Sequence, residues 1–354
     1  MVEEPDTTVV EERGTSVSKP VSKPVEEPGV SRQALSGPSS TTEEFETVAV
    51  VVVTFNRADL LARMLKGLAA LDRQPDVVIV VDNASTDHTR LVLEAAPNRD
   101  LVAIHMTENL GGAGGFHRGV GAAYEQGFDR IWLMDDDVVP APDCLTVLLA
   151  QVGREVGACL MAVREDTNGR LVEKAATVFD LRNPLAIKPK TAMVETAYRT
   201  REAMPERVEL QNVAFEGFMV RRDVIDAIGL PDPTYFIFYD DVDFAMRARR
   251  AGYRIWGIRD AVLVRQLDFD QQHDLSGWKG FYMYRNLFVV HFRYGENLLV
   301  RLKPYLIVLG VLLLSPLRGG RAEAANVVKA IASARGMRHV PAVARPSGHQ
   351  PSID

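Results

Sequence analysis

Cysteine is scarce in this chain: only Cys144 and Cys159 occur among its 354 residues. Their spacing matches neither a zinc-ligand pattern nor a dithiol redox motif, so we expect a reducing, cytosolic setting. Positive charge is not in excess either, and a net charge of -6 argues against a general affinity for nucleic acid. The first residues, MVEEPDTTVVEERG, are acidic and lack an apolar run, so we expect no signal peptide.

The chain also lacks two familiar glycine motifs for nucleotide binding. Its glycine-rich segment, ENLGGAGGF at 108–116, has no G-x-G-x-x-G register, and no Gly-Lys-Ser or Gly-Lys-Thr follows it. A dinucleotide-binding fingerprint and a Walker loop are therefore excluded. Glycine amides at the start of a predicted helix can still approach a phosphate, and a flexible turn is the alternative interpretation.

What the chain does contain is a regular alternation of apolar strands and amphipathic helices. Residues 1–45 are rich in Pro, Glu, Ser, Thr and Val without any periodicity, which predicts a disordered tail. Beyond them, the sequence predicts strands within 46–57, 76–83, 101–109 and 129–137, and helices within 57–71, 85–96 and 113–127. This alternation predicts an α/β fold with a mostly parallel sheet flanked by helices.

Polar segments follow the four predicted strands: TFNR, VDNASTD, ENLGGAGG and MDDD. Ligands of parallel α/β sheets bind beyond the carboxyl ends of the strands, so we expect these segments to line one crevice. Asp82 and Asn83 carry groups that can hydrogen-bond a base or a ribose. Ser85 and Asp87, in the same segment, are explained well as caps of the next helix.

Three consecutive carboxylates, Asp135, Asp136 and Asp137, follow the apolar strand IWLM. Like charges placed this close repel one another, so they bring the fold no stability of their own. Carboxylates in a crevice favour a hard divalent cation, and Mg²⁺ or Mn²⁺ is usually shared with substrate phosphates. The triplet therefore predicts a metal site, with a solvated acidic turn as the alternative.

A second acidic motif, FIFYDDVDF, places Asp240, Asp241 and Asp243 after an aromatic run. Carboxylates beside an apolar wall have a raised pKa and make useful general bases. The alternative is capping, because the same residues open a predicted helix at 241–253, where acids favour the first turn. We expect one of the three to be a cap.

The C-terminal region, 297–354, has a different character. Its segment KPYLIVLGVLLLSPLRGG contains about 13 nearly continuous apolar residues, fewer than the roughly 20 of a membrane span. From Arg301 onward there are eight Lys or Arg and two Asp or Glu. A short apolar segment bracketed by basic residues predicts an interfacial membrane anchor, and a buried C-terminal helix is the alternative.

These motifs, in this order, resemble the family-2 inverting glycosyltransferases of the GT-A fold, over roughly residues 48–296. The resemblance implies that Asp135 and Asp137 bind Mn²⁺ or Mg²⁺, and that Asp241 is the general base, with Asp240 as the alternative. The donor contacts that it implies are Thr54, Asn56, Arg57, Asp82, Asn83, Asn109, Gly111, Gly112, Gly114, Asp136 and Arg265.

A narrower likeness rests on NLGGAGGF, FEGFMVRR and FYMYRN, which are similar to segments of the actinobacterial galactofuranosyltransferases that start the cell-wall galactan. It implies transfer of galactofuranose from a UDP donor to a polyprenyl-diphosphate-linked saccharide at the cytoplasmic face of the plasma membrane. The implied acceptor contacts are Glu216, Trp278, Tyr282 and Arg285, although aromatic residues at this spacing are more commonly core. A dTDP-rhamnose-dependent rhamnosyltransferase is the alternative.

One position departs from the family pattern. A metal-binding His is often found about 24 residues beyond the base, and this chain has Arg265 there. Arginine stays protonated and cannot ligate a cation. Either His273 replaces that ligand, or Arg265 contacts the diphosphate directly, or the metal site is weakened. We favour the contact with diphosphate, with a surface ion pair as the alternative.

Two other functions remain open on the sequence alone. LMDDDVV also fits an aspartyl-phosphate hydrolase with Asp135 as nucleophile, and a sugar-nucleotide-binding protein without catalysis is a second alternative. We expect a nucleotide-sugar-binding part at 46–150, an acceptor-binding part with the base at 151–296, and a helical membrane-associating extension at 297–354.

Overall fold

The computed structural model describes residues 46–154, 158–186, 188–267, 275–318 and 320–339. Four parallel strands form one half of its main sheet, in the order β3-β2-β1-β4. Their bounds are β1 Val48–Thr54, β2 Val77–Asp82, β3 Leu101–His105 and β4 Arg130–Asp135. All seven residues of β1 are buried, as its run of valines predicts for a central strand covered on both faces. The predicted parallel sheet is confirmed.

Helices cover both faces of this half because the valines of β1 point alternately to either side. Val50 and Val52 belong to an apolar cluster with Leu61 of α1, whereas Val51 and Val53 pack with Val120 of α3. The helices in this half are α1 Ala58–Ala69, α2 Thr89–Glu94 and α3 Gly111–Glu125, whereas α4 Cys144–Leu149 packs against the other half of the sheet.

The second half of the sheet mixes directions. Strand β10 runs antiparallel to both β4 and β6, and β11 runs parallel to β6. The strands here are β5 Val138–Pro140, β6 Cys159–Glu165, β9 Arg207–Leu210, β10 Phe218–Arg221 and β11 Ile255–Arg265. A separate pair consists of β7 Ala176–Phe179 and β8 Lys190–Met193. The connecting helices are α5 Val194–Tyr198, α6 Arg222–Ile228 and α7 Asp240–Arg250, with single turns at Arg201–Ala203 and Pro233–Tyr235.

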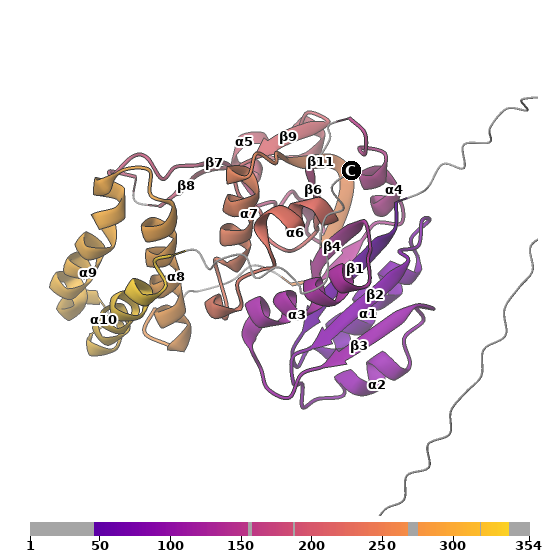
Figure 1. The fold of residues 1–354 in the computed structure, drawn as a ribbon, viewed down its shortest axis with the longest axis horizontal. Helices are drawn as coiled ribbons and strands as arrows, with labels where there is room; N and C mark the ends of the chain where they lie inside the picture. Colours follow the sequence, from indigo (N-terminus) through magenta and orange to yellow (C-terminus); the bar gives the residue numbers. More distant parts are fainter. Residues whose placement is uncertain (1–45, 155–157, 187, 268–274, 319, 340–354) are drawn as a thin grey trace, which may run out of the picture. The chain divides into compact units, whose positions relative to one another are not determined.

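Three helices complete the described chain: α8 Trp278–Tyr294, α9 Leu298–Arg318 and α10 Arg321–Gly336, grouped together at the yellow end of Figure 1. Helix α9 exceeds the 13 apolar residues expected from sequence, and its window Leu298–Ser315 is long and apolar enough to cross a membrane by length and composition. Only 17% of that window is buried. The alternative of a C-terminal helix buried in the core is therefore wrong, because most of α9 has no protein against it.

A buried charge network joins α7 to α8. The carboxylate of Asp243 accepts hydrogen bonds from Arg293 at 2.8 Å and from the hydroxyl of Tyr294 at 2.6 Å, and Arg247 donates to its other oxygen at 2.9 Å. Asp243 is fully buried, so these cations and the hydroxyl compensate for the loss of water. The N-cap residue of α7 is Tyr239, whose side chain makes no cap hydrogen bond, but Asp241 in the first turn accepts from the amide of Val242 at 2.6 Å, so one of the three acids satisfies an amide at the start of the helix.

The loop before α7 has an unusual backbone. Phe236, Phe238 and Tyr239 all adopt positive φ angles, between 63° and 66°, a region that costs L-residues free energy. Asn286 of α8 compensates, because its Nδ2 donates to the carbonyls of Tyr235, Ile237 and Phe238. The loop thereby delivers the first turn of α7 to the edge of the sheet.

The described residues belong to one compact unit that spans 45–354. The predicted tail, 1–45, lies outside the described residues. The subdivision at residues 150 and 296 stays a prediction.

Candidate functional site

The carboxyl ends of the four parallel strands bring polar side chains into one row. Thr54 is the register partner of Asp82, and Asp82 is the partner of His105. On the other side of β1, Asp135 lies opposite Val53. The predicted crevice edge is therefore formed by the end of each strand, as expected for a ligand site in a parallel sheet.

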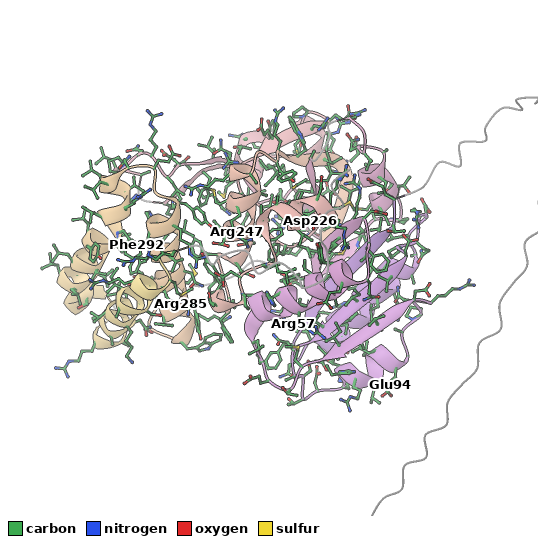
Figure 2. All side chains as sticks on the ribbon, in the orientation of Figure 1. Arg57, Glu94, Asp226, Arg247, Arg285 and Phe292 are labelled. Atoms are coloured by element: carbon green, nitrogen blue, oxygen red, sulfur yellow. The ribbon has the colours of Figure 1, made fainter. Side chains whose placement is uncertain are left out.

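Asp136 is the most enclosed member of the triplet. It is 2% exposed, its Oδ2 accepts a hydrogen bond from the Thr54 hydroxyl at 2.7 Å, and Arg57 donates to its Oδ1 at 3.1 Å. Burial raises the pKa of Asp136 to about 6, although Arg57 and Thr54 favour its ionised form. The guanidinium of Arg57 also reaches Asp137 at 3.3 Å, so one cation from the first loop faces two carboxylates. Figure 2 labels Arg57, whose side chain is 46% exposed.

Asp135 and Asp137 fit the expected divalent cation. Burial, followed by the charges of Glu216 and Asp137, raises the pKa of Asp135 well above its usual value, and burial and Glu216 raise the pKa of Asp137. The Oδ1 atom of Asp137 is buried and has no hydrogen-bond partner among the described residues. Such an atom needs either a proton or a cation.

Within the described part of the chain, no three His, Cys, Asp or Glu side chains gather as a metal-binding group. Two carboxylates still suit Mg²⁺ or Mn²⁺, which commonly takes its other ligands from water and substrate phosphates. The proposed third ligand, His273, lies outside the described residues.

A chain of four alternating charges runs behind the triplet. Arg265 donates through Nη2 to both carboxylate oxygens of Glu216, at 2.7 and 2.6 Å, and Arg164 reaches Glu216 at 2.6 Å and Glu173 at 2.6 Å. All four residues are buried. Both oxygens of Glu216 are paired with arginines, and its contact with an acceptor stays a prediction. The ion pair of Arg265 is buried, whereas the alternative that we weighed was a surface pair, and its contact with a diphosphate also stays a prediction.

The pKa values of Asp240 and Asp241 are both raised, but to different extents. Burial and the neighbouring charge of Asp241 raise the pKa of Asp240 to about 8. Burial also raises the pKa of Asp241, to about 6, but the ammonium of Lys190 opposes the rise. At neutral pH, Asp241 is therefore mainly ionised and able to accept a proton, whereas Asp240 is mainly protonated.

Glu216 connects the two acidic motifs electrostatically. Its charge raises the pKa values of Asp135, Asp137 and Asp241 alike, which requires all three to be near it. The structure thus brings together the predicted metal ligands and the predicted base, from β4 and α7, which lie about 100 residues apart in the sequence.

Several predicted donor contacts instead tie loops to one another. Asn83 donates to Asn109 at 3.0 Å and to the carbonyl of Gly111 at 2.8 Å, and it accepts from the amide of Leu110. Asn109 accepts from the amide of Gly111. Asn56, with φ of 52°, accepts from the amide of Thr86. These side chains shape the crevice from behind.

The glycine segment serves packing. The amide of Gly114 donates to the Leu110 carbonyl, and the amide of Ala113 donates to the Phe236 carbonyl. A Cβ at Gly111 would lie 1.9 Å from the Phe236 carbonyl oxygen, and one at Gly115 would lie 2.5 Å from Val53. The amides of Gly111 and Gly114 thus already have partners inside the protein, and nothing lies within 4 Å of a Cβ at Gly112. The approach of these amides to a diphosphate stays a prediction.

An aromatic cluster adjoins the start of α3. The rings of Phe236 and Tyr282 stack at 4.9 Å, and Trp278, which is 59% exposed, lies edge-on to both. Arg285 donates through Nη2 to the carbonyls of Thr234 and Tyr235, and its contact with an acceptor stays a prediction. Figure 2 labels Arg285, which lies on α8. The exposed part of the cluster is therefore aromatic.

Two residues of the site were missed on sequence. His105 donates to or accepts from Asp82 at 3.0 Å, and its place at the end of a predicted strand was a usable signal. Lys190 lies near Asp241, and burial together with other cations lowers its pKa while Asp241 opposes that change. No local sequence pattern singles out Lys190. It lies on β8, and the pairing of β8 with β7 brings it to the site.

Comparison with known proteins agrees with this geometry. A family profile described as "Glycosyltransferase like family 2" matches residues 46–276. Galactofuranosyltransferase GlfT1 of Mycobacterium tuberculosis is 32% identical over 266 residues, covering 68% of this chain and 81% of the relative. GlfT1 of Mycolicibacterium smegmatis is 33% identical over 209 residues, covering 58% and 67%.

More distant matches have the same fold. The N-acetylglucosaminyl-diphospho-decaprenol L-rhamnosyltransferase of M. tuberculosis is 26% identical over 233 residues, covering 59% of this chain and 72% of the relative. The crystal structure of S. aureus TarS 1–349 in complex with UDP-GlcNAc matches with a TM-score of 0.52 at 18% identity, covering 83% and 82%. That of GalNAc-T7 with UDP, GalNAc and Mn²⁺ matches with a TM-score of 0.54 at 15% identity, covering 72% and 49%.

These matches confirm the resemblance seen in the sequence. The aspartyl-phosphate hydrolase is excluded, because neither the family nor the fold is that of such an enzyme, and a binding protein without catalysis is not supported. The chain therefore belongs to glycosyltransferase family 2, and it is a glycosyltransferase with a GT-A type fold.

Proposed function

We propose that this glycosyltransferase transfers galactofuranose from UDP-galactofuranose to a polyprenyl-diphosphate-linked cell-envelope glycan, with inversion at the anomeric carbon. The observation that carries the proposal is the 32% identity to a galactofuranosyltransferase over 266 residues. The site described above supports the chemistry, because it combines two paired carboxylates with a separate ionised aspartate.

Asp241 is the proposed base. It takes the proton of the acceptor hydroxyl while that oxygen forms a bond to the anomeric carbon. The bond from this carbon to the UDP oxygen breaks at the same time, and the electron pair leaves with UDP. The charge of Lys190 keeps Asp241 ionised near neutral pH, and Asp240 keeps its proton.

Asp135 and Asp137 would hold Mn²⁺ or Mg²⁺. When bound, the cation supplies positive charge to the diphosphate of the donor and removes the repulsion within the triplet. Arg57 follows β1 and Asp82 ends β2, and they are the proposed contacts for the phosphate and the ribose, respectively. Asp136 keeps Arg57 in place through the 3.1 Å contact.

The acceptor side is proposed to be the aromatic cluster and the membrane. The exposed ring of Trp278 and the ring of Tyr282 offer stacking surfaces for a sugar. Helix α9 exposes leucines beside arginines, which suits a peripheral position on the cytoplasmic face of the plasma membrane. One face of α9 packs on α8 and α10, so we propose that the helix lies in the interface instead of crossing the bilayer.

A second donor deserves a test because a rhamnosyltransferase is also among the relatives, at 26% identity. We would measure the melting temperature with UDP and with dTDP, each with Mn²⁺ and with a chelator. A ligand at 100 times its dissociation constant adds about 2.7 kcal/mol to the free energy of unfolding. Metal-dependent stabilisation by UDP supports the galactofuranose donor, and a preference for dTDP transfers the proposal to rhamnose. Absence of stabilisation by either nucleotide would contradict it.

A further inference from the structure

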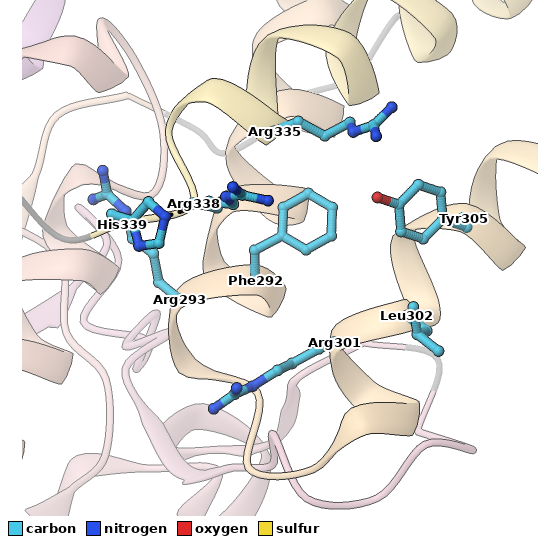
Figure 3. A pocket seen from close by; sticks show the side chains of 8 residues that line it. All are labelled: Phe292, Arg293, Arg301, Leu302, Tyr305, Arg335, Arg338 and His339. Carbon is cyan, nitrogen blue, oxygen red and sulfur yellow. Dashed lines mark hydrogen bonds between the residues drawn. The ribbon is translucent and has the colours of Figure 1, made fainter.

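A basic pocket lies among the three C-terminal helices. Its volume is about 550 Å³, and Figure 3 shows its lining. Phe292 of α8 and Tyr305 of α9 face each other across it, with ring centroids 5.9 Å apart. The side chains that line it are Phe292, Arg293, Arg301, Leu302, Tyr305, Arg335, Arg338 and His339, and no carboxylate is among them. The pocket therefore collects positive charge over an aromatic floor.

The four arginines of the pocket differ in whether they already form ion pairs with other residues of the protein. Arg293 donates to Asp232, Asp243 and the carbonyl of Met337, so it is part of the framework. Arg301, Arg335 and Arg338 are exposed, and within the described residues none of these three forms an ion pair. Arg301 donates through Nε to the carbonyl of Gly295 at 2.8 Å, and Figure 3 shows its guanidinium on the opposite side of the pocket from that of Arg335. The exposed guanidinium groups of Arg335 and Arg338, with no carboxylate in the lining, favour an anion with several oxygens.

An apolar surface begins at the same place. Leu302 lines the pocket and is 44% exposed, and further exposed leucines continue from it along α9. They are Leu298, Leu299, Leu306, Leu309, Leu313 and Leu314, with exposed fractions between 46% and 69%. A soluble ligand would leave these side chains in water, whereas an acyl or prenyl chain would cover them.

We propose that this pocket binds the phosphate group of a membrane lipid, whose hydrocarbon chain follows the exposed leucines of α9. Arg335 and Arg338 contact the phosphate oxygens. The combination of clustered cations with adjoining apolar surface matches a lipid and not a free phosphate. The site is distinct from the one that carries out transfer.

The separation from the transfer site follows from α7. Asp241 and Asp243 are two residues apart on this helix, so their side chains point about 200° apart around its axis. Asp241 lies near Lys190 and Glu216, whereas Asp243 faces Arg293, which lines the pocket. The inference rests on one part of the proposed function, the membrane position of α9, and is independent of the donor sugar.

The test measures binding of the full chain to vesicles. We would compare phosphatidylcholine alone with the same vesicles containing phosphatidylglycerol or a polyprenyl diphosphate at matched surface charge. The pocket variant is R335Q/R338Q, and the control is R321Q/K329Q, which removes two exposed charges from the same helix. We expect the pocket variant to bind anionic vesicles roughly 25-fold more weakly, about fivefold for each arginine, and the control to lose much less.

The outcomes separate the sources of phosphate. Equal losses of vesicle binding in the two double variants would show that the cations act by general attraction to the membrane surface. That result would overturn the proposed binding site in the pocket. In another outcome, pyrophosphate raises the melting temperature of the parent protein but not of R335Q/R338Q, while the parent does not bind vesicles. That result would show a soluble phosphate ligand and overturn the proposal of a lipid. Tighter binding to polyprenyl diphosphate than to phosphatidylglycerol supports the proposal and assigns the phosphate to the acceptor class, and equal binding supports it for membrane lipids in general.

Metal-dependent binding of UDP is measured on the same variants. It stays unchanged where only the pocket is lost, so failure of this inference and failure of the proposed function give different results. The melting temperature of each variant confirms that the exposed substitutions leave the fold intact.

Discussion

Arg265 holds both carboxylate oxygens of Glu216 through a single nitrogen, at 2.7 and 2.6 Å, in the interior of the protein. Arg265 stands where the family often has a metal-binding histidine. Its charge lowers the pKa of Asp137, and that of Glu216 raises it. The pair therefore influences the acidic triplet by its field, without supplying a ligand.

This pair gives a prediction for stability. Leaving a buried charge without any partner costs about 3 to 5 kcal/mol, but Arg164 stays within 2.6 Å of Glu216 when Arg265 is removed. We therefore expect Arg265→Met to lower the free energy of unfolding by less than that amount. The double variant Glu216→Leu/Arg265→Met should lose less than the sum of the single variants in denaturant unfolding. Additive losses would show that the two side chains do not act as a pair.

The two acids that open α7 are separable by mutation. Asp241→Asn should reduce turnover by roughly 10² to 10⁴-fold, because it removes the base, and should leave UDP binding intact. Asp240→Asn is the matched control. Its turnover should stay close to that of the parent, because Asp240 already carries a proton near neutral pH. If Asp240→Asn reduced turnover more than Asp241→Asn, the general base would be Asp240 instead of Asp241.

Lys190 should set the acidic limit of activity. Turnover should fall as the pH drops below about 6, where Asp241 takes up a proton. Removing the cation in Lys190→Met raises the pKa of Asp241 further, so the acidic limb of kcat/KM moves to higher pH. Lys190→Arg keeps the charge and should restore the limb toward its original position. A pH profile unchanged by Lys190→Met would contradict this coupling.

The Mn²⁺ dependence of UDP binding should be lost when the carboxylate of Asp137 is replaced, because its buried Oδ1 has no hydrogen-bond partner among the described residues. We expect Asp137→Asn to abolish the additional stabilisation that Mn²⁺ gives to the UDP complex. It should also raise the melting temperature of the free protein, because a buried carboxylate with a raised pKa is replaced by a neutral amide. Asp59→Asn on α1, which removes an exposed carboxylate nearby, is the control for net charge.

Asn286 should control the loop that presents the base. Asn286→Ala removes three hydrogen bonds from a segment with three left-handed residues. We expect faster amide exchange at 236–239 and lower turnover with the fold retained. Asn326→Ala is a close match, since Asn326 likewise donates to three carbonyls, those of Leu275, Ser276 and Gly277. Equal effects on turnover would remove the special role of the loop.

The part of the fold that could be predicted is the part with local signals. The valine run of β1, the helical spacing of Leu61, Met64 and Leu65, and the polar segments after each strand are visible without any partner. These signals, together with the geometry of parallel sheets, predicted that the polar residues at the carboxyl ends of the strands lie in one row. Asp135 and Asp241 could be selected in the same way, because each acid follows an apolar or aromatic run.

The rest depends on contacts between segments far apart in the chain. Asn83 and Asn109 carry the groups expected of nucleotide contacts, yet each finds the other across 26 residues. Glu216 faces arginines from β6 and β11, and a sequence does not reveal whether a polar atom is already satisfied inside the protein. Glycines are ambiguous for the same reason, since close packing of α3 on β1 and approach of a ligand both require the absence of a Cβ.

The match to the family ends at residue 276, just before α8 begins at Trp278. The family match therefore covers α7 but not the C-terminal helices α8, α9 and α10. Asp243 couples the two parts mechanically, because its partners Arg293 and Tyr294 belong to α8. A substitution on the exposed surface of α9 can leave this buried contact unchanged, whereas a change at Arg293 or Tyr294 reaches α7, the helix that carries Asp241.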